Sequence, residues 1–370
     1  MQAWTTGSPV TGTFNDATGL PTVLLAEHYL IRGAAETATT QACTQLQELA
    51  ASNANSVGVI VVILVAGLPL FCAALLHILT GSWRAGLLPA WLVAIFEQFT
   101  SAVSYGMLDN VLSSGIFAVA TLCLAFAARF GRIVPAVAAG LLFAAAAAFG
   151  SQINLLVPLL MAVALGITGM ARSQDRRVAW LTALGLFAGW APAAVAIITI
   201  NAAATNRYLV LTNYDLSAAS QRLGIAALGE NREFPQVSWP TPPASSANVG
   251  PSQDIFQGLL RSDDRVASLV GLYGSEMVVR PLQFVFETLA LSAQTFWRHG
   301  YFFFLVALYY LPVSWRIARA RGMLPCLMAA ILAPALLVLL NGIFANGHWV
   351  LSLSAVIPIV VIPGHVWRGM

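Results

Sequence analysis

The stretch that decides the fold runs over residues 111–160 and reads VLSSGIFAVATLCLAFAARFGRIVPAVAAGLLFAAAAAFGSQINLLVPLL. It holds three apolar runs separated by two short breaks. One break carries Arg129 and Arg132, and the other carries no charge. Each run approaches the length of about 20 residues that a helix needs to cross the hydrocarbon core of a membrane. Because connections this short join antiparallel neighbours, the sequence predicts packed hairpins of membrane helices here.

The same apolar character extends over the whole chain. Its 370 residues are 58% hydrophobic and only 9% charged, and the mean hydropathy is +0.78. In a water-soluble domain, about a quarter of the residues are charged. The net charge of +3 is too small to indicate nucleic-acid binding. We therefore predict an all-α, multi-pass integral membrane protein that is solvated by membrane lipid and has no nucleic-acid partner.

We expect about nine transmembrane helices and one long extracytoplasmic loop region. The apolar segments cover residues 57–80, 86–106, 111–128, 133–150, 152–171, 178–200, 300–318, 323–343 and 348–366. They divide the chain into an extracytoplasmic N-terminal segment (1–55), a six-helix membrane region (56–200), an extracytoplasmic loop with an amphipathic helix (201–299) and a three-helix membrane region (300–370). Within the loop, residues 284–297 are amphipathic and are expected to lie along the membrane interface.

Arginine marks alternate breaks between these segments. It follows the first, third, fifth, seventh and ninth segments, as Arg84, Arg129, Arg132, Arg172, Arg176, Arg177, Arg316, Arg319, Arg321 and Arg368. The other short breaks, at 107–110, 150–154 and 341–347, contain no arginine. Basic residues of short loops stay in the cytoplasm. The pattern therefore places residues 1–55, the break at Asp109 and residues 201–299 on the opposite side.

Three polar positions on that side each have two interpretations. Asp109 and Asn110 either cap the next helix or place a carboxylate at the mouth of a cavity. Asp16 precedes an apolar stripe of helical spacing in FNDATGLPTVLLAEHYLIRGAAET (14–37), so it either caps a surface helix or is a catalytic carboxylate held over the membrane. His348 either belongs to a capped helix start or contacts a phosphate or sugar.

Several chemistries find no support in the sequence. It contains no GxGxxG, P-loop, HExxH or serine nucleophile elbow. We therefore expect no nucleotide cofactor and no ATP-driven transport by this chain. No ligand cluster predicts a metal, although a divalent metal stays open as a cofactor.

The layout resembles the polytopic membrane glycosyltransferases of the C-type fold, the protein-mannosyltransferase-like group. The resemblance is carried by residues 108–160, by NRYLVLTNYDLSAASQRLGIAALGEN (206–231), by residues 263–297 and by NGHWVLSLSAVIPIVVI (346–362). It implies an enzyme that moves a sugar, a hexose or pentose, from a polyprenyl-phosphate carrier to an extracytoplasmic glycan, lipid or protein acceptor. It also implies a place in a bacterial plasma membrane.

The resemblance assigns roles to particular residues. The family's catalytic base is an acid of the first outer loop, and Asp16 is the nearest match, with Asp109 as a second catalytic acid. Glu27, Asn110 and His348 would contact the substrate. The leaving phosphate needs positive charge nearby, and Arg207 and Arg222, which lie on the predicted outer side, either contact it or are solvated loop arginines. The family's first membrane helix has no counterpart here, so we expect that residues 1–55 begin within the first outer loop.

Two other classes of function stay open. A secondary transporter or lipid-carrier flippase would show inverted repeats and broken helices near the membrane centre, and Glu97 inside the second apolar segment favours it. The other alternative is an inactive, truncated homologue.

Overall fold

The computed structural model describes residues 63, 66–94, 108–171, 176–205, 208–209, 216, 219–220, 222–223, 255, 258–259, 262, 264–298, 301–344 and 352–369. Within these ranges the chain forms helices and turns and no strand. The elements are an apolar helix Ala66–Thr80, α4 (Arg84–Ala94), α6 (Leu108–Phe130), α7 (Ile133–Phe149), η2 (Gln152–Leu155), α8 (Leu156–Ala171), α9 (Arg176–Thr205), α12 (Arg265–Val279), α13 (Pro281–Arg298), α14 (Tyr301–Ala320), α15 (Leu324–Phe344) and α16 (Ser352–Gly369).

The prediction of an all-helical membrane protein is confirmed in its coarse form. Three helical stretches are long and apolar enough to cross a membrane: Leu112–Phe130, Gln152–Met170 and Arg176–Ala202. A fourth arises if α13 and α14, which meet at 113°, count together as one broken span. Each of the nine predicted segments contains a described helix, but several of these helices are short. The count of nine spans stays a prediction.

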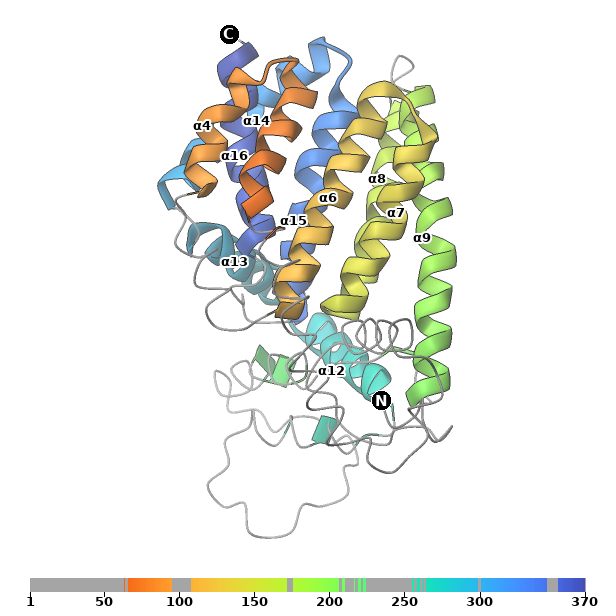
Figure 1. Cartoon of the computed structure of the whole chain (residues 1–370). Helices are drawn as coiled ribbons and strands as arrows, with labels where there is room; N and C mark the ends of the chain where they lie inside the picture. The colour runs from red at the N-terminus through yellow and green to blue at the C-terminus, as the bar shows by residue number, and fades with distance from the viewer. Residues whose placement is uncertain are drawn as a thin grey trace.

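The helices form a bundle around α15 (Figure 1). On one side, α7 packs against both α6 and α9, and α8 packs against α9. On the other side, α16 packs against α14, α15 and α4. Because α15 also contacts α6, α8 and α13, it joins the two halves. This arrangement agrees with the antiparallel hairpins predicted for residues 111–160.

Glycine lets α7 and α9 approach closely. A Cβ added to Gly140 would overlap the carbonyl of Leu186, and one added to Gly189 would overlap the carbonyl of Val137. Such close crossings of small residues are typical of membrane helices, where van der Waals contact between backbones replaces the hydrophobic effect as the driving force. These two close contacts explain why α9 stays packed against α7 although much of the surface of α9 is exposed.

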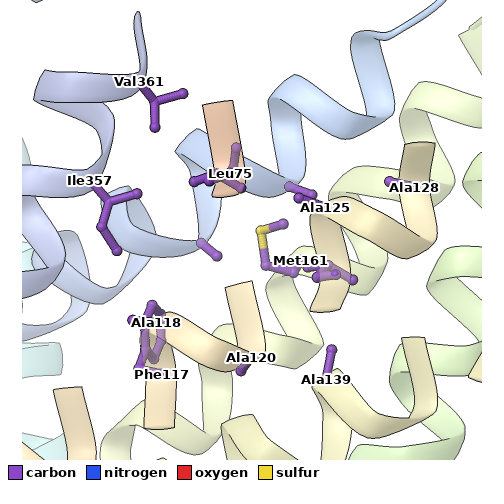
Figure 2. Close-up of a cluster of buried hydrophobic side chains, with 14 of the residues drawn as sticks. Leu75, Phe117, Ala118, Ala120, Ala125, Ala128, Ala139, Met161, Ile357 and Val361 are labelled. Carbon is purple, nitrogen blue, oxygen red and sulfur yellow. The ribbon is translucent and has the colours of Figure 1, made fainter. Parts of the chain in front are cut away.

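The core draws on the beginning and the end of the chain. Leu75, Met161 and Leu327 are each at most 1% exposed. Figure 2 shows side chains of the helix Ala66–Thr80, α6, α8 and α16 meeting in one cluster. Alanine supplies many of its members, and this allows the helix axes to lie close together. The two predicted membrane regions, 56–200 and 300–370, therefore share a single core.

One end of the bundle collects the arginine turns, and we call it the arginine end. Three helices stop there at a glycine with left-handed backbone: Gly81, Gly131 and Gly322 have φ of 72°, 64° and 62°. Each lies within three residues of an arginine, and glycine adopts this helix-ending conformation without strain. The guanidinium of Arg368 also donates to the Ser82 hydroxyl at 2.7 Å, which ties the end of α16 to the turn before α4.

Candidate functional site

The opposite end of the bundle carries the candidate site, and we call it the capped end. There α6 begins at Leu108, α7 ends at Phe149 and α15 ends at Phe344. Helices α12 and α13 lie across it (Figure 1). A second apolar cluster of described residues covers this end: it includes Leu216, Leu259 and Leu269, and it packs against Ile153 of η2 and Ile343 of α15. The described residues of the 201–299 region therefore pack on the bundle.

Asp109 and Asn110 lie at the capped end, within the first turn of α6. The sequence predicted a polar break with these residues ahead of the helix, but the helix already includes them. A carboxylate in this turn is stabilised by the positive end of the helix dipole. An N-cap residue precedes the first helical residue, so neither Asp109 nor Asn110 occupies the cap position that the sequence predicted, whereas the predicted place at the mouth of a cavity stays a prediction. Their side chains lie outside the described residues.

Four other predicted site residues also lie outside the described part of the chain: Asp16, Glu27, Arg207 and His348. Glu97, which favoured a transporter, lies outside it as well. Their predicted roles stay predictions.

Arg222 is the predicted site residue whose side chain the structure describes, and it is only 6% exposed. One terminal nitrogen donates to the carbonyls of Gly342 and Ile343. The other donates to the Thr288 hydroxyl at 2.6 Å and to the Phe284 carbonyl at 3.4 Å. Gly342 and Ile343 belong to the last turn of α15, where helix carbonyls lack partners within the helix. Arg222 therefore caps α15 and fastens it to α13.

Aromatic rings complete the surroundings of Arg222. The guanidinium carbon lies 4.6 Å from the ring centre of Phe284 and 5.8 Å from that of Tyr273. Burial lowers the pKa of Arg222, while Tyr273, Glu287 and Glu276 act in the opposite direction. Burial likewise raises the pKa of Tyr273, against the influence of Arg222. Arginine stays charged even in such places because its ordinary pKa is above 12. The guanidinium of Arg222 thus lies buried among neutral oxygen acceptors.

The sequence suggested Arg222 as a contact for the leaving phosphate, and that role stays a prediction. Four of its hydrogen bonds already go to protein acceptors. Those acceptors lie 62 to 121 residues away along the chain. No local pattern could indicate such partners. A phosphate contact would therefore have to be added to the helix cap or replace part of it.

A second buried polar contact at this end was not predicted. The Asn201 amide donates to Gln152 Oε1 at 2.9 Å and to the Tyr208 carbonyl at 3.2 Å. Asn201 and Gln152 are 1% and 2% exposed. The contact joins η2 to the last turns of α9. The sequence signal that could have indicated this contact is Asn201 itself, an amide at the end of a long apolar run, since buried polar groups require partners.

Helix α13 includes residues 284–297, where the sequence predicted an amphipathic helix, and its place along a membrane interface stays a prediction. The buried face consists of Phe284 and the hydroxyl residues Thr288, Ser292 and Thr295, and each hydroxyl donates to a carbonyl of its own helix. Ser292 packs so closely on Gly342 of α15 that a Cβ there would lie 2.6 Å from its hydroxyl oxygen. The exposed face holds larger apolar residues: Leu282, Val285, Phe286, Leu289 and Trp297. Small groups inward and large apolar groups outward are typical of a helix bordered by lipid.

The described residues contain no group of three or more His, Cys, Asp or Glu side chains that could hold a metal ion. Asp16, Glu27 and His348 lie outside the described residues. The described residues therefore neither support nor exclude a divalent metal cofactor.

No protein family, no curated protein and no solved structure matches this chain. The resemblance to C-type glycosyltransferases consequently rests on the sequence layout alone.

Proposed function

We propose that this protein is an integral membrane glycosyltransferase of a bacterial plasma membrane. It moves a hexose or pentose from a polyprenyl-phosphate carrier to a glycan, lipid or protein acceptor outside the cytoplasm. The observation that carries the proposal is the first turn of α6. This turn sets Asp109 and Asn110 at the end of the bundle opposite the arginine turns and on the side that α12 and α13 cover. Basic turns mark the cytoplasmic side, so this end faces outward.

The chemistry requires a base and a place for a leaving anion. A carboxylate removes the proton from the acceptor hydroxyl while the hydroxyl oxygen attacks the anomeric carbon of the sugar. The bond between the sugar and the carrier phosphate breaks, and the polyprenyl phosphate leaves with the bonding electrons. Asp16 is the proposed base, and Asp109 lies at the rim of the same site. Backbone N–H groups in the first turn of a helix favour a phosphate nearby, and α6 offers such a turn.

The test uses membranes containing the full chain and a panel of labelled polyprenyl-phosphate hexoses and pentoses. The readout is the release of free polyprenyl phosphate, which does not depend on the identity of the acceptor. Asp16→Asn should lower the release by about 10² to 10⁴-fold, the typical contribution of a general base. Asp109→Asn should also lower it, by a smaller factor.

Asp264→Asn supplies the matched control. Asp264 caps α12 in the same region by accepting a hydrogen bond from the Ala267 N–H at 2.9 Å. Asparagine caps helices equally well, so this change removes a charge and preserves the fold. Release equal to that of membranes without the protein would refute the enzyme, and equal release above that background by all four proteins would refute the roles given to Asp16 and Asp109. Movement of intact donor between the leaflets, without release, would assign the chain to the flippases instead.

A further inference from the structure

An apolar groove separates α14 from α15. Its volume is about 500 Å³, within the range of about 300 to 1,000 Å³ that small-molecule sites occupy. It is lined by Leu311, Pro312, Trp315, Leu327, Met328, Ile331 and Leu332. None of these residues carries a charge, and the indole N–H of Trp315 is the single polar side-chain group among them. The lining therefore suits a hydrocarbon and offers almost nothing to a polar ligand.

The groove follows from how α14 is held. This helix packs mainly against α16, and its contact with α15 is slight. Pro312 stands in the middle of α14, where proline removes a backbone hydrogen bond and bends a helix. Leu327 of α15 is 1% exposed and forms part of the floor, while Pro312 and Trp315 stand exposed on the α14 side. The groove is therefore a gap between two elements of the bundle rather than a closed hole in its core.

The lining of the groove is shorter than half the thickness of a membrane. On α15 the lining ends at Leu332, eight residues from the first residue of the helix, or about 12 Å along the axis. On α14 it ends at Leu311, five residues before Arg316 and eight before Arg319, or about 8 to 12 Å. Half of the hydrocarbon core is about 15 Å thick. Measured from the arginine end, the lining therefore stays within the thickness of one leaflet.

Positive charge stands at the mouth of the groove. Arg316 follows Pro312 by one helical turn, and Arg319 follows Trp315 by the same interval, so both continue the side of α14 that faces the groove. Both arginines are exposed, and Arg321 lies in the turn that leads to α15. Basic clusters at the cytoplasmic surface attract anionic lipid headgroups by about 1 kcal/mol per residue.

We propose that this groove binds one chain of an anionic phospholipid from the leaflet at the arginine end. Its phosphate lies against Arg316 and Arg319. The apolar lining suits the acyl chain of the lipid, and the length of the lining stays within one leaflet. The two arginines at the mouth suit the negative charge of the headgroup. This site is separate from the proposed transfer reaction, which takes place at the capped end, and its test requires no activity.

The test places the photoreactive amino acid benzoylphenylalanine at Met328, inside the groove. A matched probe replaces Leu184 on α9, which is 56% exposed and belongs to a helix that packs against α7 and α8. The full chain is reconstituted in nanodiscs of equal amounts of phosphatidylglycerol and phosphatidylcholine and irradiated. Mass spectrometry then identifies each adduct. We expect lipid adducts at both positions, with phosphatidylglycerol enriched at Met328 by about fivefold or more over Leu184, since about 1 kcal/mol corresponds to this factor.

Charge variants test the headgroup contact. In the Met328 probe, Arg316→Gln combined with Arg319→Gln should reduce the enrichment to the value at Leu184, whereas Arg177→Gln on α9 should leave it unchanged. Size-exclusion profiles confirm that each protein compared is folded. Equal lipid ratios at the two probes would overturn the proposal, because the groove would then hold only bulk lipid. Adducts between Met328 and a peptide of this chain, or of a second copy, would overturn it as well.

Discussion

Replacement of Arg222 by methionine gives the sharpest test of how the capped end is held together. The change keeps an unbranched side chain of similar length but removes the donors that serve Gly342, Ile343, Phe284 and Thr288. The carbonyls of α15 then lose their cap, and α13 loses its polar link to α15. We expect a lower melting temperature and a loosened contact between these two helices.

The magnitude follows from the contacts of Arg222. A hydrogen bond from a charged donor contributes about 1.5 to 3 kcal/mol, and four of them sum to more than truncation actually costs. Water reaches part of the carbonyls once the side chain is gone. The cost should therefore fall near the 3 to 5 kcal/mol typical of removing one partner from a buried charged contact. At about 2 °C per kcal/mol for a large domain, the melting temperature drops by about 6 to 10 °C.

The assay is a thermal scan in one detergent at one scan rate, because a melting temperature depends on the scan rate wherever unfolding is irreversible. Arg177→Met, an exposed arginine at the start of α9, is the matched control and should melt like the wild type. Arg222→Lys keeps the charge but lacks the fork of donors, so it should lose about half as much as the methionine variant. Hydrogen exchange should rise in residues 281–295 and 338–344. A methionine variant that melts within about 1 °C of wild type, with unchanged exchange there, would refute the capping role.

Two further predictions concern helix packing and membrane orientation. Gly189→Ala should destabilise the protein by about 1 to 3 kcal/mol, because its Cβ would overlap the Val137 carbonyl. Gly271→Ala on α12, which has open space around it, should be neutral or stabilising by up to about 1 kcal/mol, and equal melting temperatures for the two variants would contradict this packing. In a chain whose native cysteines are replaced by serine, a single cysteine at Trp83 should react with an impermeant thiol reagent only from the cytoplasm. A cysteine at Ala267 should react only from outside, and labelling of both from one side would overturn the orientation.

Much of the fold could be predicted from the sequence. Apolar length and the spacing of arginines indicated a helical membrane bundle, and each predicted segment contains a described helix. The amphipathic pattern of residues 284–297 indicated α13, which extends only a few residues further at its start. These features depend on neighbours along the chain, and periodicity reports them directly.

The candidate site could be predicted only in part. Asp109 and Asn110 were expected before a helix and lie in its first turn, a shift within the ordinary uncertainty of helix ends. The partners of Arg222 could not be inferred, because its acceptors come from α13 and α15. The pairing of Gln152 with Asn201 joins residues 49 positions apart, and composition carries no information on such a contact.

The sequence by itself determined that this chain is helical, apolar and asymmetric in charge between its two faces, since those properties are sums over local residues. Only the tertiary structure decided that Arg222 is a buried helix cap and that the described residues of the 201–299 region pack onto the bundle. It also decided that α14 stands away from α15 and leaves an apolar groove. The physical reason is that burial and partner choice depend on how helices pack. Packing is fixed by shape complementarity between segments far apart in the chain.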